Sequence, residues 1–345
     1  MPGIIYARCG HRAADRPDLT MPESALKMSE SAGADDRTEL TFAHITDAHL
    51  TSPDGASAGE LMNKRILGAL SWRRRRRHIH RPSVLSALVT DLAAQAPAHV
   101  AITGDLTQIG LPMECQAARA WLDELAPPAG VSLVPGNHDR YARAAWAETV
   151  GLWAPYAATD ATGRVVTRDP ASPDAPEFPA VRVRGPVAFI GVSSSVVSPW
   201  FMATGRVGAA QRGHLGRILE RAGDAGLFRV LLIHHTPVPG GDKWRKRLTD
   251  AGDVARLIGR HGAELVLHGH THRLQTSRLP GPDGRSVPVV GLSSASADDP
   301  RPGREARYSL WTVQHADGGH RLTHRSRVFR DGLFAEGTDW NPLDQ

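Results

Sequence analysis

The sequence is poor in cysteine and contains no long apolar run. Cys9 and Cys115 are the only two cysteines among 345 residues, so a disulfide framework is not expected. No apolar segment approaches the length that crosses a bilayer, and the start of the chain holds no apolar signal-peptide core. Together these absences predict a cytoplasmic protein.

Aromatic residues and net charge are also low. Aromatic residues make up 6% of the chain, and the formal net charge is +5 at pH 7. The contents of hydrophobic residues (41%) and charged residues (22%) are typical of a globular protein that buries a full core. The positive charge is nevertheless concentrated in two places, the arginine run 73–77 and the basic cluster 243–247.

The distribution of apolar residues predicts an α/β fold that follows a leader. Residues 1–39 are rich in Pro, Ser, Asp and Arg and predict a disordered leader. From residue 40 onwards short apolar runs alternate with helical stretches, and the last part of the chain alternates like antiparallel strands. We expect a four-layer αββα sandwich, in which two mixed β-sheets pack face to face and helices flank them. The main expected helices are 83–94, 113–125, 141–150, 209–222 and 254–261.

Five of the apolar runs end in side chains that bind metal ions. The clearest run stops at Gly104 and is followed by Asp105. Because open α/β sheets place their ligands at the carboxyl ends of strands, the side chains after these runs are expected to converge. The other four runs lead into Asp47 and His49, into Asn137, His138 and Asp139, into His234, and into His270 and His272.

The residue types at these strand ends suit two-metal phosphoester hydrolysis. In such sites two cations about 3.5–4 Å apart clamp the attacking and leaving oxygens. A bridging anion offsets their repulsion, and Asp105 fits that position. Asp47 and His49 are two residues apart, so both side chains turn to one side of an extended loop. His270 and His272 repeat this spacing.

Read in order, the blocks D-x-H, G-D, G-N-H-D, H and G-H-x-H resemble those of the calcineurin-like metallophosphoesterases, from residue 40 to about 296. The resemblance implies one metal ion on Asp47, His49, Asp105 and His272, and a second on Asp105, Asn137, His234 and His270. It also implies that His138 contacts the phosphate or protonates the leaving group, and that Asp139 holds the other nitrogen of His138. A hydroxide bridging two ions would attack phosphorus in line. The expected ions are Mn or Fe, with Zn as an alternative.

The remaining histidines have a plainer interpretation. A single histidine is more often packed or solvated than bound to metal, and His268 precedes the last block without belonging to it. For His78 and His80 the sequence does not decide between a packed or solvated state and a functional role. We expect a packed or solvated state for His44, His99, His214, His261, His315, His320 and His324.

Three loops are expected around this site. An amphipathic stretch, 61–72, runs into the arginine run, the loop 199–202 carries Trp and Phe, and the basic cluster follows the strand that ends at His234. One interpretation is a rim that binds a phosphorylated amphiphile and touches a membrane surface; the other is a solvated face with tryptophans that cap the core. The candidate substrate-binding residues are Trp72, Arg73, Arg74, Arg75, Arg76, Arg77, Lys243, Trp244 and Arg245.

The leading hypothesis is a dinuclear-metal phosphodiesterase or pyrophosphatase in a domain spanning 40–330, followed by a tail at 331–345. Its expected partner is a phosphorylated small molecule or a lipid-linked substrate, and nucleic acid stays an alternative. The block 63–72 resembles, more loosely, enzymes that cleave UDP-2,3-diacylglucosamine, which would place the protein at the inner face of the membrane. A cyclic-nucleotide phosphodiesterase is the competing enzyme, and a binding module without catalysis is the alternative from another class. The oligomeric state stays open.

Overall fold

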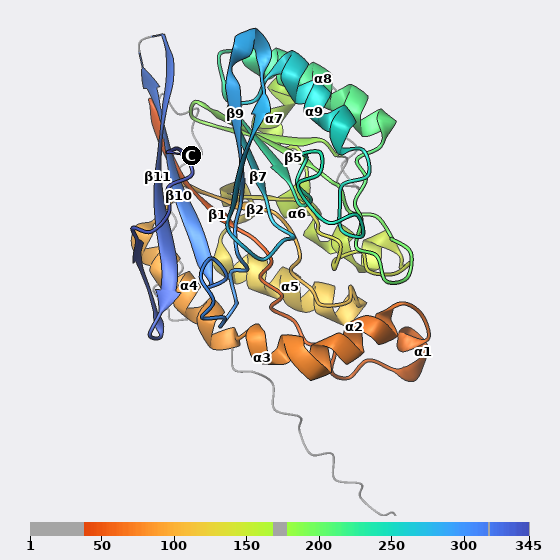
Figure 1. Cartoon of the computed structure of the whole chain (residues 1–345). Coiled ribbons are helices and arrows are strands. Elements are labelled where there is room, and N and C mark those ends of the chain that lie inside the picture. The colour runs from red at the N-terminus through yellow and green to blue at the C-terminus, as the bar shows by residue number, and fades with distance from the viewer. Residues whose placement is uncertain (1–37, 168–177, 317, 345) are drawn as a thin grey trace, which may run out of the picture.

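The computed structural model describes residues 38–167, 178–316 and 318–344. All but the last two residues of the predicted leader lie outside this part of the chain. The described chain forms two six-stranded sheets that pack face to face, with helices on their outer faces (Figure 1). The predicted four-layer αββα sandwich is therefore confirmed.

The first sheet has the strand order β12-β11-β10-β1-β2-β3. The neighbours β1, β2 and β3 run parallel, whereas β10, β11 and β12 continue the sheet in antiparallel fashion. Their bounds are β1 Glu39–Ile45, β2 His99–Ile102, β3 Val131–Leu133, β10 Arg307–Ala316, β11 Gly319–Arg330 and β12 Leu333–Gly337. The last strand lies in the segment predicted as a tail, so that segment supplies an edge of the sheet.

The second sheet has the order β4-β5-β6-β7-β9-β8. The pairs β5-β6, β6-β7 and β7-β9 are parallel, and an antiparallel strand closes each edge. Its strands are β4 Ala180–Arg184, β5 Val187–Val192, β6 Phe228–Ile233, β7 Leu265–His268, β8 Gln275–Pro280 and β9 Ser286–Gly291. This arrangement points the carboxyl ends of β6 and β7 the same way.

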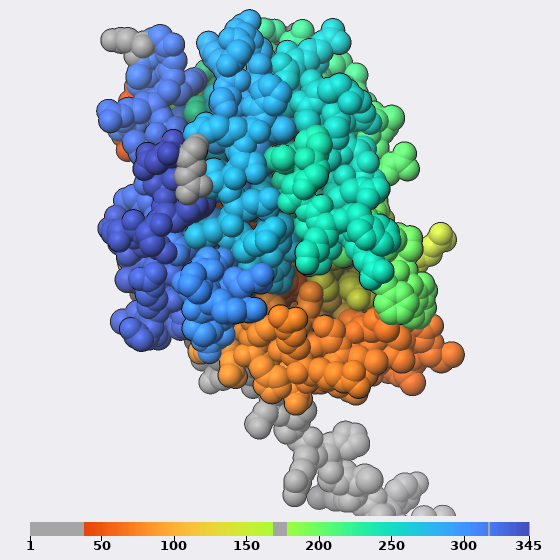
Figure 2. Space-filling model, viewed as in Figure 1, coloured from red at the N-terminus to blue at the C-terminus, as the bar shows by residue number. Residues whose placement is uncertain are grey.

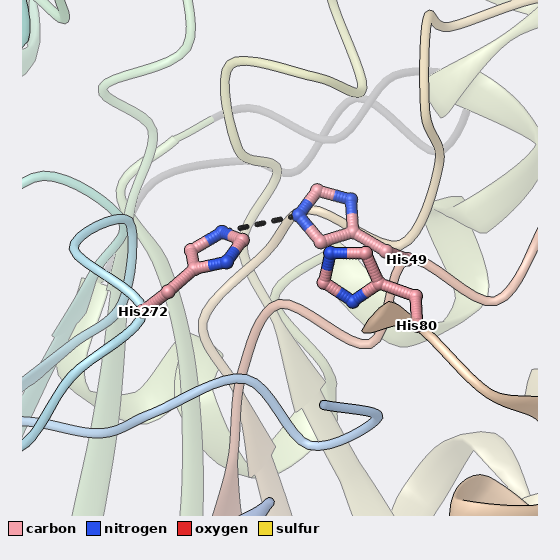
Figure 3. Close-up of side chains that lie close together, drawn as sticks. All are labelled: His49, His80 and His272. Atoms are coloured by element: carbon pink, nitrogen blue, oxygen red, sulfur yellow. Dashed lines mark hydrogen bonds between the residues drawn. The ribbon is translucent and has the colours of Figure 1, made fainter. Parts of the chain in front are cut away.

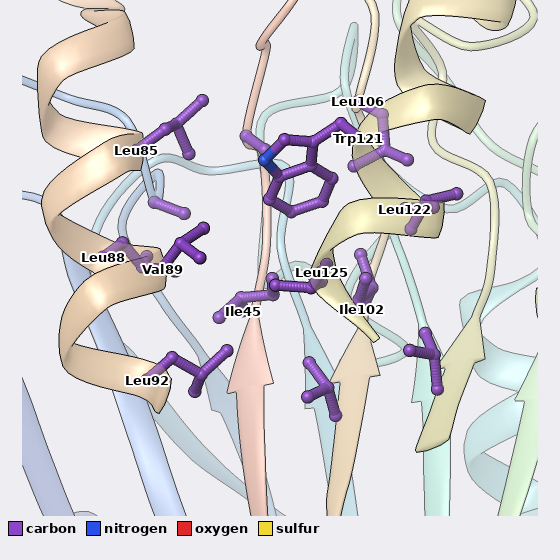
Figure 4. Packing of buried hydrophobic residues seen from close by; sticks show 14 of the residues in the cluster. Ile45, Leu85, Leu88, Val89, Leu92, Ile102, Leu106, Trp121, Leu122 and Leu125 are labelled. Atoms are coloured by element: carbon purple, nitrogen blue, oxygen red, sulfur yellow. The ribbon is translucent and has the colours of Figure 1, made fainter. Parts of the chain in front are cut away.

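Apolar side chains fill three layers between these elements. Figure 4 shows α4 (Pro82–Gln95) and α5 (Pro112–Leu125) packing Leu88 and Leu122 onto Ile45 and Ile102 of the first sheet. A second cluster joins α8 (Ala209–Asp224) and α9 (Ala251–His261) to the outer face of the second sheet. A third cluster, which includes Phe42 and Phe189, lies between the two sheets. These helices match the predicted ones to within a few residues.

One predicted helix does not form. Residues 141–150 are mostly irregular, with short 3-10 turns at Trp146–Glu148 and Val150–Trp153 followed by α6 Ala154–Ala157. Only Thr149 and Val150 are buried between residues 141 and 150, so the segment lacks the apolar stripe that would hold a helix against the core. The prediction of a helix at 141–150 was wrong for that reason.

The stretch between β1 and α4 is helical almost throughout. It comprises α1 (Ala58–Leu61), α2 (Arg65–Ser71), a π-helical turn (Trp72–Arg76) and α3 (Arg77–Ile79). These pieces, orange in both views, lie along one end of the sandwich against the loops of the second sheet (Figures 1 and 2). A further short helix, α7 (Ala161–Thr167), lies beside β4. No helix in the described ranges is long and apolar enough to cross a membrane.

Candidate metal centre

The candidate metal centre lies where strands of both sheets end. The loops after β1, β2 and β3 carry Asp47, Asp105 and Asn137, and those after β6 and β7 carry His234 and His270. Several of these residues have a left-handed backbone, which is rare outside glycine. The φ values are 52° at Asp47, 41° at His49, 57° at Asp105, 71° at His270 and 50° at His272. Such strain gathers where a site must aim its side chains.

The first group of ligand atoms comes from Asp47, His49, Asp105 and His272. These four residues each offer an atom within 4.8 Å of the others. The Nε2 atom of His272 lies 3.1 Å from Asp47 Oδ1 and 3.2 Å from His49 Nε2. His272 is also the most exposed of the four, with 25% of its side chain accessible, so solvent reaches the group from its side.

The second group comprises Asp105, His234 and His270 and meets the same distance condition. His234 Nε2 lies 3.3 Å from Asp105 Oδ2 and 3.1 Å from the amide oxygen of Asn137. Asp105 belongs to both groups, so its carboxylate lies between them. The structure thus brings together all seven residues that the sequence predicts as ligands.

Outer hydrogen bonds direct the ligand atoms inward. His49 Nδ1 donates to Thr107 O over 2.9 Å, and His234 Nδ1 donates to Thr103 O over 2.7 Å. Each ring therefore turns its Nε2 atom toward the carboxylates. Among the described residues, Asp47 Oδ1, Asp105 Oδ2 and His270 Nε2 are buried and have no hydrogen-bond partner. A mixed set of imidazole and carboxylate atoms left open in this way fits transition-metal ions.

The charges of the two ligand groups also favour the binding of cations. Burial opposes ionisation of Asp105, yet the neighbouring His234 charge holds its pKa well below the ordinary value. Burial lowers the pKa of His234, but Asp105 outweighs it and raises the pKa to about 9. Burial lowers the pKa values of His49 and His270 well below their ordinary value, so both rings are neutral. Ionised carboxylates in a buried place need positive charge at their open oxygens.

Two glycines of the sequence blocks are required by close approach. A side chain at Gly136 would collide with Asp105 Oδ1, and one at Gly269 would collide with Asp47 Oδ2 and the Thr46 hydroxyl. The glycine that precedes the Asn137 block and the one that precedes His270 therefore let the loops close on the carboxylates.

Asp139 does not hold His138, contrary to the role implied by the resemblance. Its carboxylate accepts from the backbone N–H groups of Asp105 and Gly136, both over 2.8 Å, and from that of Thr107 over 3.0 Å. His138 instead donates from Nδ1 to Gln108 O over 2.5 Å. Because its oxygens accept hydrogen bonds from these three backbone N–H groups, Asp139 links the loop after β2 to the loop after β3 and positions Asp105.

Two residues of the helical insertion reach the cluster, a placement that the sequence did not resolve. Figure 3 shows the ring of His80 beside those of His49 and His272, and the ring centroids of His80 and His49 are 4.6 Å apart. His80 Nδ1 lies 2.8 Å from the hydroxyl of Ser296, whereas His78 is exposed. Arg76 Nη2 donates to His138 Nε2 over 2.8 Å. The sequence could not single out Arg76, because nothing in it distinguishes one arginine of the run from another.

The other predicted substrate-binding residues lie further out. Trp72 is only 9% exposed, so burial of its indole contradicts the prediction of a substrate contact there. The π-helical turn points Trp72 inward together with Arg65, Gly68 and Ala69 of α2. The remaining candidates are exposed: Arg73, Arg74, Arg75, Arg77, Lys243, Trp244 and Arg245.

Comparison with known proteins finds relatives in sequence and in structure. The chain is 26% identical over 245 residues to a probable cyclic nucleotide phosphodiesterase of Synechococcus sp., covering 70% of this chain and 76% of the relative. It is similar in structure to a dimetal phosphatase from Danio rerio (13% identity, TM-score 0.49, 82% of this chain and 98% of that one). It is also similar to a sulfate thiohydrolase from Thermus thermophilus (20% identity, TM-score 0.47, 88% and 58%).

The comparison with protein families covers all of the predicted metal ligands. The profile described as calcineurin-like phosphoesterase matches residues 40–274, which is more than half of the chain and includes both ligand groups. Enzymes of this family are metal-dependent hydrolases of phosphoric esters, and the predicted enzyme class is therefore confirmed. With its strand-end carboxylates and imidazoles inside that match, the chain belongs to the calcineurin-like phosphoesterase family.

Proposed function

We propose that this chain hydrolyses a phosphodiester or a pyrophosphate with two metal ions. The observation that carries the proposal is the pair of ligand groups that share Asp105. One ion would be held by Asp47, His49, Asp105 and His272, and the other by Asp105, Asn137, His234 and His270. The proposed ions are Mn or Fe, with Zn as the alternative, and the mixed ligand set accepts all three. When bound, the ions supply Lewis-acid charge that activates water and polarises the phosphoryl group.

Arg76 supports an anionic substrate at this site. Its guanidinium contacts His138 and Gln108, and it forms no ion pair with a carboxylate of the described residues. A guanidinium beside a place that also attracts metal cations needs an anion, and its planar donors match two phosphoryl oxygens. We assign Arg76 to binding the non-bridging oxygens of the substrate.

His138 is placed to act on the same group. Burial and the nearby Arg76 charge lower the pKa of His138 to about 3, so its ring is neutral and carries its proton on Nδ1, which donates to Gln108 O. Its Nε2 lone pair accepts from Arg76. A substrate anion that draws Arg76 away would free Nε2 to take a proton from a water molecule and pass it to the leaving oxygen, which returns the ring to its neutral state.

Hydrolysis assays test this proposal. Chelated and then Mn-reconstituted protein is assayed on bis(p-nitrophenyl) phosphate, cyclic AMP and the monoester p-nitrophenyl phosphate. We expect metal-dependent turnover with the diesters above the monoester, and loss of that turnover in Asp105→Asn. Turnover of the monoester alone, or turnover that survives chelation, would contradict the proposal. The similarity to a probable cyclic nucleotide phosphodiesterase supports including cyclic AMP.

A lipid-linked pyrophosphate is the second candidate substrate. The observation in its favour is a set of exposed large apolar side chains on loops near the site, including Phe201 at 71% and Trp244 at 58% exposure. UDP-2,3-diacylglucosamine is the test compound. Turnover of this compound well above that of both diesters would favour the lipid reading, and turnover of the diesters alone would reject it. Competition by single-stranded oligonucleotide would reveal a nucleic acid substrate.

A catalytically silent binding module is the alternative from another class. Against it, every ligand position and His138 carry side chains able to act. A module would show no turnover on any of these compounds. We place the enzyme in the cytoplasm, in peripheral contact with the inner face of the membrane, and fractionation of cells into cytosol and membrane tests that location.

A further inference from the structure

Three loops beside the metal centre present large apolar side chains to solvent. They are the α1–α2 segment, the loop after β5 and the loop after β6. We call the exposed apolar side chains on these loops the apolar rim. Their exposed fractions range from 40% to 84%, which is unusual for side chains of this size. The members are Met62, Ile66, Leu70, Val197, Trp200, Phe201 and Trp244.

Hydrogen bonds join the three loops into one surface. Lys64 Nζ donates to the Ser198 hydroxyl over 2.6 Å and to Met202 O over 2.7 Å, which fixes the α1–α2 segment to the loop after β5. The backbone N–H of Ala203 donates to Arg245 O over 2.8 Å, which fixes that loop to the next. In Figure 2 the orange segment and the green loop lie side by side at one end of the molecule. The three loops that carry the apolar rim are therefore joined to one another.

The α2 helix leaves aliphatic side chains exposed although it buries a charged one. Its buried side holds Arg65, only 5% exposed, whose Nη2 donates to Gly110 O over 2.7 Å. Ile66 and Leu70, four residues apart on α2, face solvent together with Met62 at the end of α1. A helix that buries a guanidinium and exposes an aliphatic stripe keeps that stripe for something outside the chain.

The aromatic tip of the second loop shows a similar exception. Phe201 has a φ of 62°, a left-handed conformation that is a genuine outlier for an aromatic residue. Strain of this kind persists where the surrounding structure enforces it and often marks functional sites. Here it holds a bulky ring outward, next to Trp200.

Positive charge borders the apolar rim on two sides. The arginine run continues directly from α2, and the basic cluster surrounds Trp244. Exposed arginines 73–75 and residues 243 and 245–247 form no ion pair with any carboxylate in the described ranges. A purely solvated face would not hold Trp and Phe outward, and a purely apolar partner would not need so much charge. Apolar side chains with cations beside them complement the interface of an anionic bilayer.

We propose that the apolar rim docks on an anionic phospholipid surface. Trp200, Phe201 and the aliphatic stripe of α2 enter the headgroup boundary, while the bordering arginines and lysines contact lipid phosphates. The docking does not depend on hydrolysis, because these side chains lie outside the ligand groups. If the proposed hydrolysis also holds, docking brings phosphates at the bilayer surface close to Asp105.

Vesicle flotation tests the inference directly. Full-length protein is mixed with vesicles of pure phosphatidylcholine or of equal parts phosphatidylcholine and phosphatidylglycerol. We expect flotation mainly with the anionic vesicles, and a loss of most of it in Trp200→Ser/Phe201→Ser. The matched control is Leu333→Ser, which removes a 71% exposed side chain from β12, away from the rim. The control should float like the wild type.

A charge series completes the experiment. Arg73→Ser/Arg74→Ser should weaken flotation several-fold, while Arg217→Ser/Arg321→Ser, on α8 and β11, should not. Circular dichroism and the thermal unfolding midpoint confirm that each variant is folded. No flotation by folded wild type, or equal flotation by the aromatic variant, would overturn the proposal. Equal losses of flotation in the rim pair and the control pair would contradict docking through the rim. They would indicate a general attraction of a basic protein to polyanions.

Discussion

Two groups of histidines in the structure differ in where they lie along a strand. The interior group, His44, His99 and His268, lies within strands of the two sheets. The site group follows strand ends and comprises His49, His234, His270 and His272. His44 and His99 each place one ring nitrogen 2.9 Å from a hydroxyl, that of Thr103 and Ser132 respectively. In the site group, by contrast, the Nε2 atoms gather around two carboxylates.

Burial alone does not separate these groups. His44 Nδ1 and His99 Nδ1 are buried without a partner, as is His270 Nε2 in the site group. The difference is convergence: the interior histidines belong to none of the clusters of three or more potential ligands found in the described chain, whereas the site histidines share Asp47 and Asp105. A metal centre is therefore recognised by several open atoms that meet at one point.

The largest expected effect comes from replacing one histidine of the site group with asparagine. The same replacement in the interior group is the comparison. His234→Asn removes an imidazole from the second ligand group, and we expect turnover to fall on the order of a thousandfold, since metal charge supplies several kcal/mol to the transition state. His99→Asn should keep its turnover. It should instead lower the unfolding free energy by about 1–3 kcal/mol, because it disturbs a buried hydrogen bond.

Steady-state kinetics and urea unfolding measure both quantities for the same two variants. The comparison fails if His99→Asn loses turnover as severely as His234→Asn while still folded. It also fails if His234→Asn keeps wild-type turnover and metal content.

A smaller effect is expected from Arg76, which separates the arginines that reach the site from those that do not. Arg76→Ala should lower kcat/KM on a diester about a hundredfold, because a donor aimed at the phosphoryl oxygens is lost. Arg75→Ala is the matched control, since that side chain is exposed and should leave kcat/KM nearly unchanged. Equal losses in the two variants would remove the special role of Arg76.

A positioning effect is expected from Asp139. Asp139→Asn leaves an amide that cannot accept from Asp105 N, Gly136 N and Thr107 N without repulsion by its own N–H groups. We expect metal affinity to weaken about 10–100-fold, as for other outer-shell partners. Isothermal titration of chelated protein with Mn measures this affinity. An unchanged affinity would show that the loops hold without this carboxylate.

Near neutral pH, the smallest effect concerns the acid stability that depends on the interior histidines. Burial lowers the pKa of His44 to about 3 and that of His268 to about 4, well below the unfolded value. The folded state therefore binds fewer protons than the unfolded chain below pH ~6.5. Stability is complete above that pH and falls as the pH drops toward the folded values, by at most about 1.4 kcal/mol per pH unit for each histidine.

Urea unfolding of chelated protein at several pH values measures this slope. Because burial also lowers the pKa of His99 well below its ordinary value, His99→Asn should show a shallower slope than the wild type. An identical slope in the two proteins would show that residues other than His99 cause the loss of stability at low pH.

The sequence predicts the layers of the fold and the ligand set because both depend on local patterns. Short apolar runs that end in Gly-Asp or Gly-His mark strand ends, and parallel strands bring such ends to one edge. The interior position of His44 and His99 is also predictable, since each lies within an apolar run. The same reasoning fails at 141–150, where helical propensity had no apolar stripe behind it.

Other features depend on contacts between distant segments. His80 meets His49 only because the insertion folds back over the strand ends. Arg76 differs from its four neighbours through the phase of a π-helical turn, which the sequence does not reveal. Asp139 is directed to backbone donors that come from the loop of Asp105. Tertiary placement decided each of these roles.

The most direct test of the account is a metal count on the same protein samples that are assayed for diester hydrolysis. Wild-type, His234→Asn and His99→Asn proteins are reconstituted with Mn, desalted and analysed by plasma mass spectrometry. The account predicts two ions per chain with turnover in the wild type and in His99→Asn, and fewer ions without turnover in His234→Asn. A single ion in the active wild type, or two ions retained equally in all three proteins, would contradict it.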